Sequence, residues 1–213
     1  AGPGTKATAE SESAQALWCA AVTGEGKKTY EHFTNDILSK YTNRAFTGGT
    51  NLKTMLSIPD DWRKSSYLSA VVLLDGGFIN KGMTFHRDDL KMNDIYSKKK
   101  AAYRNNDMKN LNNDKWNPGD IWAVKKGTNI AEVFANADTS IKAVNKVVQQ
   151  VFDNKTIIAI SLKMIKKENL LKLSKMNHSK NPKKTESYEL EGFKLSGAKG
   201  FFSSKASTII GSN

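Results

Sequence analysis

Two short motifs in the second half of the chain place charged side chains at the ends of predicted strands. Asn117-Pro118-Gly119-Asp120 is a turn sequence that sets a carboxylate at the start of an apolar run. Ile160-Ser161-Leu162-Lys163 closes a second apolar run with a lysine. Side chains alternate along a strand, so Ser161 and Lys163 share one face. If the two strands are neighbours, Asp120 and Lys163 converge on one site.

A carboxylate beside an ammonium group is a combination that phosphodiester hydrolysis requires. The carboxylate holds a divalent metal ion, which polarises the phosphoryl oxygen and acidifies a bound water. The ammonium orients that water or offsets charge in the transition state. Mg²⁺ and Mn²⁺ are the expected cofactors, because hard ions prefer oxygen ligands and accept sites with few protein groups. Each residue also has a structural interpretation: Asp120 as a turn residue, Lys163 as a charge that ends a strand, and Ser161 as a local hydrogen-bonding group.

The elements around these motifs predict an α/β fold with a mixed central sheet flanked by helices. Apolar spacing predicts helices over residues 10–22, 30–41 and 61–74. In the second half it predicts a strand over 120–124, a helix over 141–152 with Asp138 as N-cap, and a strand over 156–162. The run over 156–162 is β-branched and nearly continuously apolar, which is typical of a central strand covered on both faces. Residues 200–204 and 207–210 predict a final strand or hairpin.

The order P-x-D followed by a strand ending x-S-x-K resembles the PD-(D/E)xK nuclease superfamily, which has the restriction-endonuclease-like fold. The segments KWNPGDIW and IIAISLK are also similar to bacteriophage proteins associated with that superfamily. The resemblance covers the first helix and residues 115–163, with a weaker similarity in the FFSS segment near the C-terminus. It implies a mixed sheet flanked by helices, with the catalytic strands at its centre.

The resemblance also implies roles for individual residues. Asp120 would bind the metal, and Lys163 would act on the water or the transition state. Ser161 stands where the superfamily usually carries a second acid, so it would only line the site. Some members with that departure supply the acid from the first core helix, and Glu12 is the candidate for this metal ligand. Glu10 is the alternative, since both sides of the predicted helix are apolar.

The charge balance predicts a polyanionic partner. Lys and Arg number 33 against 21 Asp and Glu, a net charge of +12, and neutralising phosphates releases their condensed counterions. The segment from Lys163 to Lys184 carries eight lysines and one acid, Glu168. It is either a solvated loop or a contact to the nucleic-acid backbone, with these candidate DNA-binding residues: Lys166, Lys167, Lys172 and Lys175.

Other features narrow the class of protein. The single cysteine, Cys19, excludes an internal disulfide. The three histidines lie far apart, which disfavours a zinc site, and no Walker loop, GxGxxG turn or GxSxG elbow occurs. No apolar run is long enough to span a bilayer, and residues 1–13 lack the apolar core of a signal peptide. A secreted toxin or a membrane-binding protein is therefore disfavoured.

We therefore expect residues 1–9 to form a flexible arm and residues 10–213 to form a single nuclease-like domain. The first hypothesis is a metal-dependent endo- or exonuclease of DNA, of bacteriophage type, located in the host cytoplasm or the phage virion. The second is a virion structural protein that binds DNA or neighbouring subunits without cutting. The serine at position 161 is the feature that keeps the second hypothesis open.

Overall fold

The computed structural model describes residues 5–88, 119–135, 137, 141–161, 187–196 and 201–209. The chain separates into two compact units, Ala1–Ser174 and Lys175–Asn213, where the sequence analysis expected one domain from residue 10. The candidate site residues that the structure describes all belong to the first unit. In the second unit β5 (Ser187–Ser196) and β6 (Phe201–Ile209) form an antiparallel hairpin with a bulge between Leu190 and Phe193. The two segments expected to form a last strand or a hairpin, 200–204 and 207–210, fall in the single strand β6 as far as the structure describes them, and its partner β5 was not predicted.

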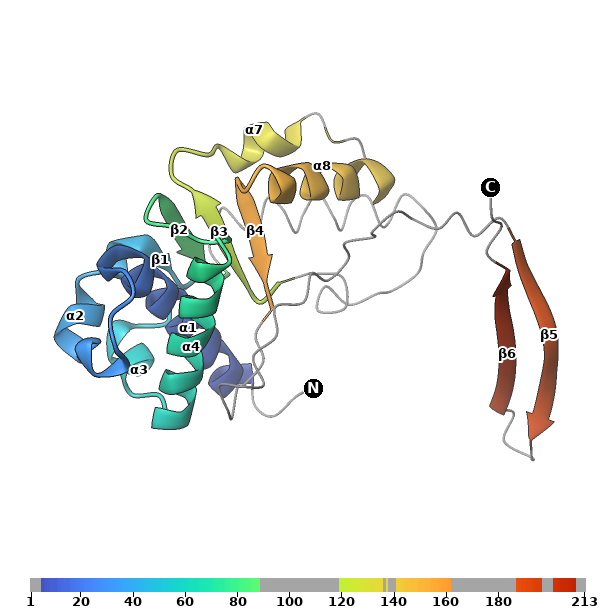
Figure 1. The fold of residues 1–213 in the computed structure, drawn as a ribbon, viewed down its shortest axis with the longest axis horizontal. Coiled ribbons are helices and arrows are strands. Elements are labelled where there is room, and N and C mark those ends of the chain that lie inside the picture. The colour runs from blue at the N-terminus through green and yellow to red at the C-terminus, as the bar shows by residue number, and fades with distance from the viewer. Residues whose placement is uncertain are drawn as a thin grey trace. The chain divides into compact units, whose positions relative to one another are not determined.

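The first unit is built around one long helix, α1 (Thr5–Glu25). It begins five residues before the predicted start, so residues 5–9 are helical rather than part of an arm. Every residue from Ser13 to Val22 is buried, as expected for a helix that is apolar on both sides. One side packs against α4 (Asp60–Asp75), which matches the helix predicted over 61–74. Figure 1 shows these two helices side by side, next to the sheet.

The helix predicted over residues 30–41 is instead broken into short pieces. The structure has η1 (Tyr30–His32), α2 (Asn35–Ser39) and η2 (Thr42–Arg44). The break falls at Thr34, whose backbone is extended with ψ of 165° and whose hydroxyl accepts a hydrogen bond from the Ile37 N–H. Threonine favours such an N-cap over a helix interior, so local capping overrides the apolar periodicity here.

Four strands of the first unit form one mixed sheet in the order β1-β2-β3-β4. They are β1 (Ala45–Phe46), β2 (Met83–His86), β3 (Ile121–Lys125) and β4 (Ile157–Ile160). β1 is parallel to β2, and the other two pairs are antiparallel. The α/β class and the mixed sheet expected from the sequence are therefore confirmed. β2 was not predicted, because four residues are too few to show a period.

Helices cover both faces of this sheet. Ile121, Ala123, Ile158 and Ile160 pack into the core that includes α1. The alternate residues Trp122, Val124 and Ile157 pack into a second core with α7 (Ile130–Ala135) and α8 (Ile141–Asp153). Figure 1 shows α7 and α8 on the opposite side of the sheet from α1. Asp138, the predicted N-cap of α8, lies outside the described residues.

The prediction that residues 156–162 form a central strand is wrong for the part of the sheet that the structure describes. There β4 is the outer strand, next to β3 only. Its nearly continuous apolar character reflects coverage of both faces by helices, and hydrophobicity reports burial of a face rather than position within the sheet.

Within the described ranges, no helix is long and apolar enough to cross a membrane.

The C-terminal end of α1 is held by a pair of side chains from the following segments. Glu25 accepts hydrogen bonds from Tyr41 Oη at 2.6 Å and pairs with His32 Nε2 at 3.0 Å. Its pKa is lowered, chiefly by the Tyr41 hydrogen bond, then by the one from His32, with a smaller contribution from the charge of Lys40. The carboxylate therefore ties η1 and η2 back to α1.

This depressed pKa predicts a loss of stability in acid. The stabilisation is present above the unfolded-state pKa of a glutamate, about 4.3, and is lost as the pH falls through the lower folded-state value. We expect the difference in free energy of unfolding between wild type and Glu25→Gln to keep its full size above about pH 5 and to shrink towards about pH 3. Urea denaturation at a series of pH values measures it, and a difference that stays constant contradicts the assignment.

Candidate functional site

The two strand motifs meet at one edge of the sheet. The backbone N–H of Asp120 donates to the Ile160 carbonyl at 2.9 Å, and Ser161 Oγ donates to Asp120 Oδ2 at 3.3 Å. β3 and β4 are thus neighbours, as the sequence analysis required, and Asp120 lies opposite Ser161. The side-chain hydrogen bond is exposed to solvent, so a ligand can reach it. Lys163, two residues beyond Ser161, lies outside the described residues.

Gly119 explains how Asp120 comes so close to β4. A Cβ on this residue would lie 2.7 Å from the Ile160 N and 2.9 Å from the Ala159 Cβ. Both of these atoms belong to β4 and have little room to move, so any side chain at position 119 would push β3 away from β4. The sequence alone shows this glycine only as part of a turn. Its further role is to let two strands approach at the residue that precedes the carboxylate.

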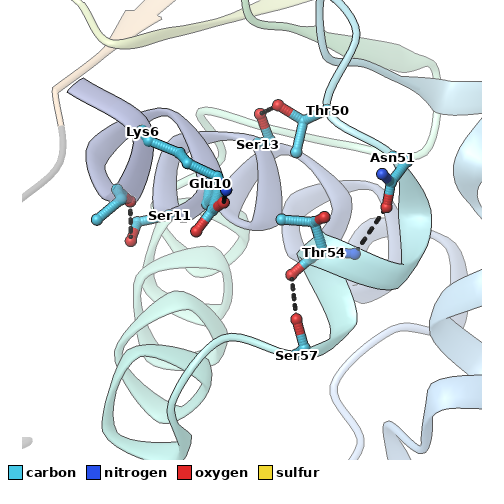
Figure 2. Close-up of polar contacts among 9 residues, drawn as sticks. Lys6, Glu10, Ser11, Ser13, Thr50, Asn51, Thr54 and Ser57 are labelled. Carbon is cyan, nitrogen blue, oxygen red and sulfur yellow. Dashed lines mark hydrogen bonds and ion pairs between the residues drawn. The ribbon is translucent and has the colours of Figure 1, made fainter. Parts of the chain in front are cut away.

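Glu12 lies on α1 and is paired with a cation. Its Oε2 accepts a hydrogen bond from Arg87 Nε at 2.8 Å, and the two side chains are only 16% and 19% exposed. Glu10, the alternative acid, instead lies 4.0 Å from Lys6 in an i,i+4 pair along the helix. Figure 2 shows that second pair, beside the Ser13–Thr50 hydrogen bond. Of the two acids, Glu12 is the one whose partner comes from the segment that follows β2.

The side chains at this edge divide between the two faces of the sheet. Strand alternation places Asp120 and Ser161 on the face of Trp122, which α7 and α8 cover. Glu12 belongs to α1, which packs on the other face. The structure therefore brings Asp120 and Ser161 together, whereas it pairs Glu12 with Arg87 at the α1 side of the same edge.

Arg87 was missed by the sequence analysis. It directly follows β2, and its own N–H donates to the Phe46 carbonyl at 2.7 Å, which extends the pairing of β1 with β2. His86 pairs with Trp122, so Arg87 comes next to Ile121 and close to Asp120. In the sequence, the only sign that Arg87 forms an ion pair is the neighbouring acid, Asp88. Its partner Glu12 is 75 positions away, so nothing local predicted the pair.

We tested whether these residues fit a divalent metal. Mg²⁺ binds six oxygens at about 2.0–2.1 Å, so neighbouring ligand oxygens lie about 3 Å apart. The separation of 3.3 Å between Asp120 Oδ2 and Ser161 Oγ is close to that value. In the parts of the chain that the structure describes, no group of three or more His, Cys, Asp or Glu side chains gathers around one point. The described residues therefore offer one carboxylate, that of Asp120, oriented by the Ser161 hydroxyl, and a metal ion held there would complete its shell with water and phosphate oxygens.

The remaining candidates contribute little to the described site. The four lysines named as DNA contacts (Lys166, Lys167, Lys172 and Lys175) lie outside the described residues. Cys19 is buried, and burial raises the pKa of its thiol to about 12, so it is a core residue rather than a nucleophile. His32 bonds Glu25, and His86 is buried against Thr84. Neither histidine belongs to a described cluster of metal ligands.

No protein-family model, curated protein or solved structure matches this chain.

Proposed function

We propose that this protein hydrolyses phosphodiester bonds of DNA with the help of a divalent metal ion. The observation that supports the proposal is the hydrogen bond between Ser161 and Asp120, which joins the two strand motifs at an exposed edge. The donor set suits Mg²⁺ or Mn²⁺, and the basic chain suits a polyanionic substrate.

Each residue has a role that follows from its chemistry. Asp120 would hold the metal, which when bound would polarise the phosphoryl oxygen and acidify a water. Ser161 orients the Asp120 carboxylate by donating to Oδ2 and lines the site. Lys163 lies two residues further along the chain, on the same face as Ser161 if the strand continues. Its ammonium would then offset the negative charge that develops on the phosphoryl oxygens.

A cleavage assay tests this proposal. The protein is incubated with supercoiled plasmid and with linear duplex DNA, in Mg²⁺, in Mn²⁺ and in excess EDTA. We expect nicking or degradation with either metal and none with EDTA. Binding of DNA without cleavage under all three conditions would overturn the proposal.

A second candidate function is a virion structural protein that binds DNA or neighbouring subunits. The observation that favours it is the ion pair of Glu12, because Oε2 of this carboxylate accepts a hydrogen bond from Arg87 Nε at 2.8 Å and its charge is already balanced by a cation. Ser161 also carries no charge where the resembled family has an acid. DNA binding without cleavage, combined with self-association in sedimentation experiments, would favour this candidate.

Both candidates predict salt-dependent binding through the lysine-rich segment. A footprint of about five phosphates gives a slope of about −4 to −5 when log K is plotted against log salt concentration. Neutralising four lysines together should flatten that slope by several units: Lys166, Lys167, Lys172 and Lys175. Fluorescence anisotropy with duplex DNA measures it.

The control removes the same charge from exposed lysines of the first unit: Lys28, Lys40, Lys53 and Lys81. This control variant should change the slope less than neutralising the four lysines of the lysine-rich segment does. If the slope of the first variant equals that of wild type, the lysine-rich segment is only a solvated loop.

A further inference from the structure

The hairpin of the second unit has a long outer strand edge. Among the strands that the structure describes, β5 pairs only with β6, so its other edge can offer backbone N–H and C=O groups to a further strand. A two-stranded hairpin by itself has little stability in water, and three or more strands with a common apolar face are usually needed. The residues of β5 decide which strand fits that edge.

A bulge sorts the residues of β5 into an apolar face and a polar face. Between Leu190 and Phe193 the strand has two residues, where β6 has one. The extra residue resets the alternation of faces, so Leu190 and Phe193 share a face although they are three positions apart. The apolar set is Tyr188, Leu190, Phe193 and Leu195, and the polar set is Ser187, Glu189, Lys194 and Ser196.

The residues of β5 follow the same pattern in both directions. From either end they run polar, apolar, charged, apolar, and the two halves meet at Glu191-Gly192. The two charged positions have opposite signs, with Glu189 before the centre and Lys194 after it. An antiparallel pairing of β5 with a second β5 about this centre therefore sets apolar positions opposite apolar ones and the acid opposite the base. Pairs of both kinds stabilise a sheet.

The bulge is what makes β5 complementary to itself. Glu189 and Lys194 are five positions apart, so in a regular strand they would lie on opposite faces and could not stand opposite each other in a two-fold pairing. With the bulge they share a face, and the two-fold axis repeats each contact. The cross-strand pairs between two copies would be Ser187–Ser196, Tyr188–Leu195, Glu189–Lys194 and Leu190–Phe193.

The strand β6 does not fit a second copy of itself in this way. Its middle residue is Lys205, so a symmetric pairing of two β6 strands would set Lys205 opposite Lys205. Like charges directly opposite each other destabilise a strand pair, and lysine on an edge strand is a common protection against unwanted pairing. The two edges of the hairpin therefore differ, and the edge of β5 is the one suited to a second copy.

We propose that β5 is a dimerisation strand, which pairs antiparallel with β5 of a second copy of this chain about a two-fold axis at Glu191-Gly192. The two hairpins then form one four-stranded sheet with a continuous apolar face, which is the arrangement that a single hairpin lacks. The two-fold pairing is closed, so it produces a dimer rather than an open chain of subunits. This inference is independent of the proposed function, because a dimer is compatible with both candidate functions.

Sedimentation velocity of the full chain without DNA, over a range of concentrations, tests the dimer. We expect the wild type to show a monomer–dimer equilibrium. Glu189→Lys and Lys194→Glu each replace two opposite-charge pairs with two like-charge pairs, so the dissociation constant of either variant alone should rise about tenfold. An equal mixture of the two variants should associate like the wild type, because the mixed dimer regains both opposite-charge pairs. Mixing would not repair a folding defect in either variant.

Lys53→Glu is the matched control, because it reverses the charge of an exposed lysine on α3 (Leu52–Leu56) in the first unit. It should leave the dissociation constant unchanged, as should Lys205→Gln. A tighter dimer of Lys205→Gln would assign the contact to β6 and overturn the inference. A wild type that stays monomeric at its highest soluble concentration, single variants that associate like the wild type, or a mixture that does not recover would also overturn it. Plasmid cleavage by a monomeric protein would leave the proposed function standing.

Discussion

Replacing Asp120 with asparagine is expected to abolish metal-dependent cleavage of DNA. The amide lacks the negative charge that anchors a divalent ion, while its shape still allows the hydrogen bond with Ser161. We expect the rate to fall by about a thousandfold, because the ion that would polarise the phosphoryl oxygen and acidify the water loses its anchor. DNA binding should persist, or strengthen, because a negative charge beside the phosphates is lost. Plasmid cleavage and anisotropy measured on the same preparation separate the two effects.

Asp153→Asn is the matched control for this change. Asp153 ends α8, is exposed and accepts a hydrogen bond from Gln149 at 2.9 Å. The substitution makes the same change in charge away from the sheet edge, so cleavage should remain near the wild-type rate. Equal activity of Asp120→Asn and wild type would show that the site lies elsewhere.

The parts of the fold that the sequence predicted correctly are those with a strong local signal. α4 follows a Pro59 and ends before a glycine pair, and its predicted bounds differ by one residue at each end from Asp60–Asp75. β3 and β4 stand out as apolar runs next to turn residues. The adjacency of β3 and β4 was a condition of the site hypothesis, and the hydrogen bond from Asp120 N to Ile160 O meets it.

The parts that could not be predicted depend on distant contacts. β2 is recognisable only by its pairing with β1 and β3, since four residues carry no clear period. The partner of Glu12 is another example, because the ion pair with Arg87 forms only when α1 packs beside the end of β2. A helical wheel could not separate Glu10 from Glu12, since both sides of α1 are apolar. The contacts of α1 with the rest of the fold distinguish them.

Gly119→Ala should reduce both stability and activity, although the residue carries no chemistry. The added Cβ would lie 2.7 Å from Ile160 N and 2.9 Å from Ala159 Cβ, so β3 must move away from β4 where Asp120 begins the strand. We expect a loss of about 1–3 kcal/mol in the free energy of unfolding. A displacement of about 1 Å at Asp120 would lower the cleavage rate by about a hundredfold. Gly82→Ala, just before β2, is the control, because its Cβ would meet only the Asn80 side chain at 3.1 Å. Urea denaturation and plasmid cleavage compare the two variants. If Gly119→Ala loses stability but keeps its activity, the position of Asp120 against β4 does not matter for the reaction, and the proposed site is wrong.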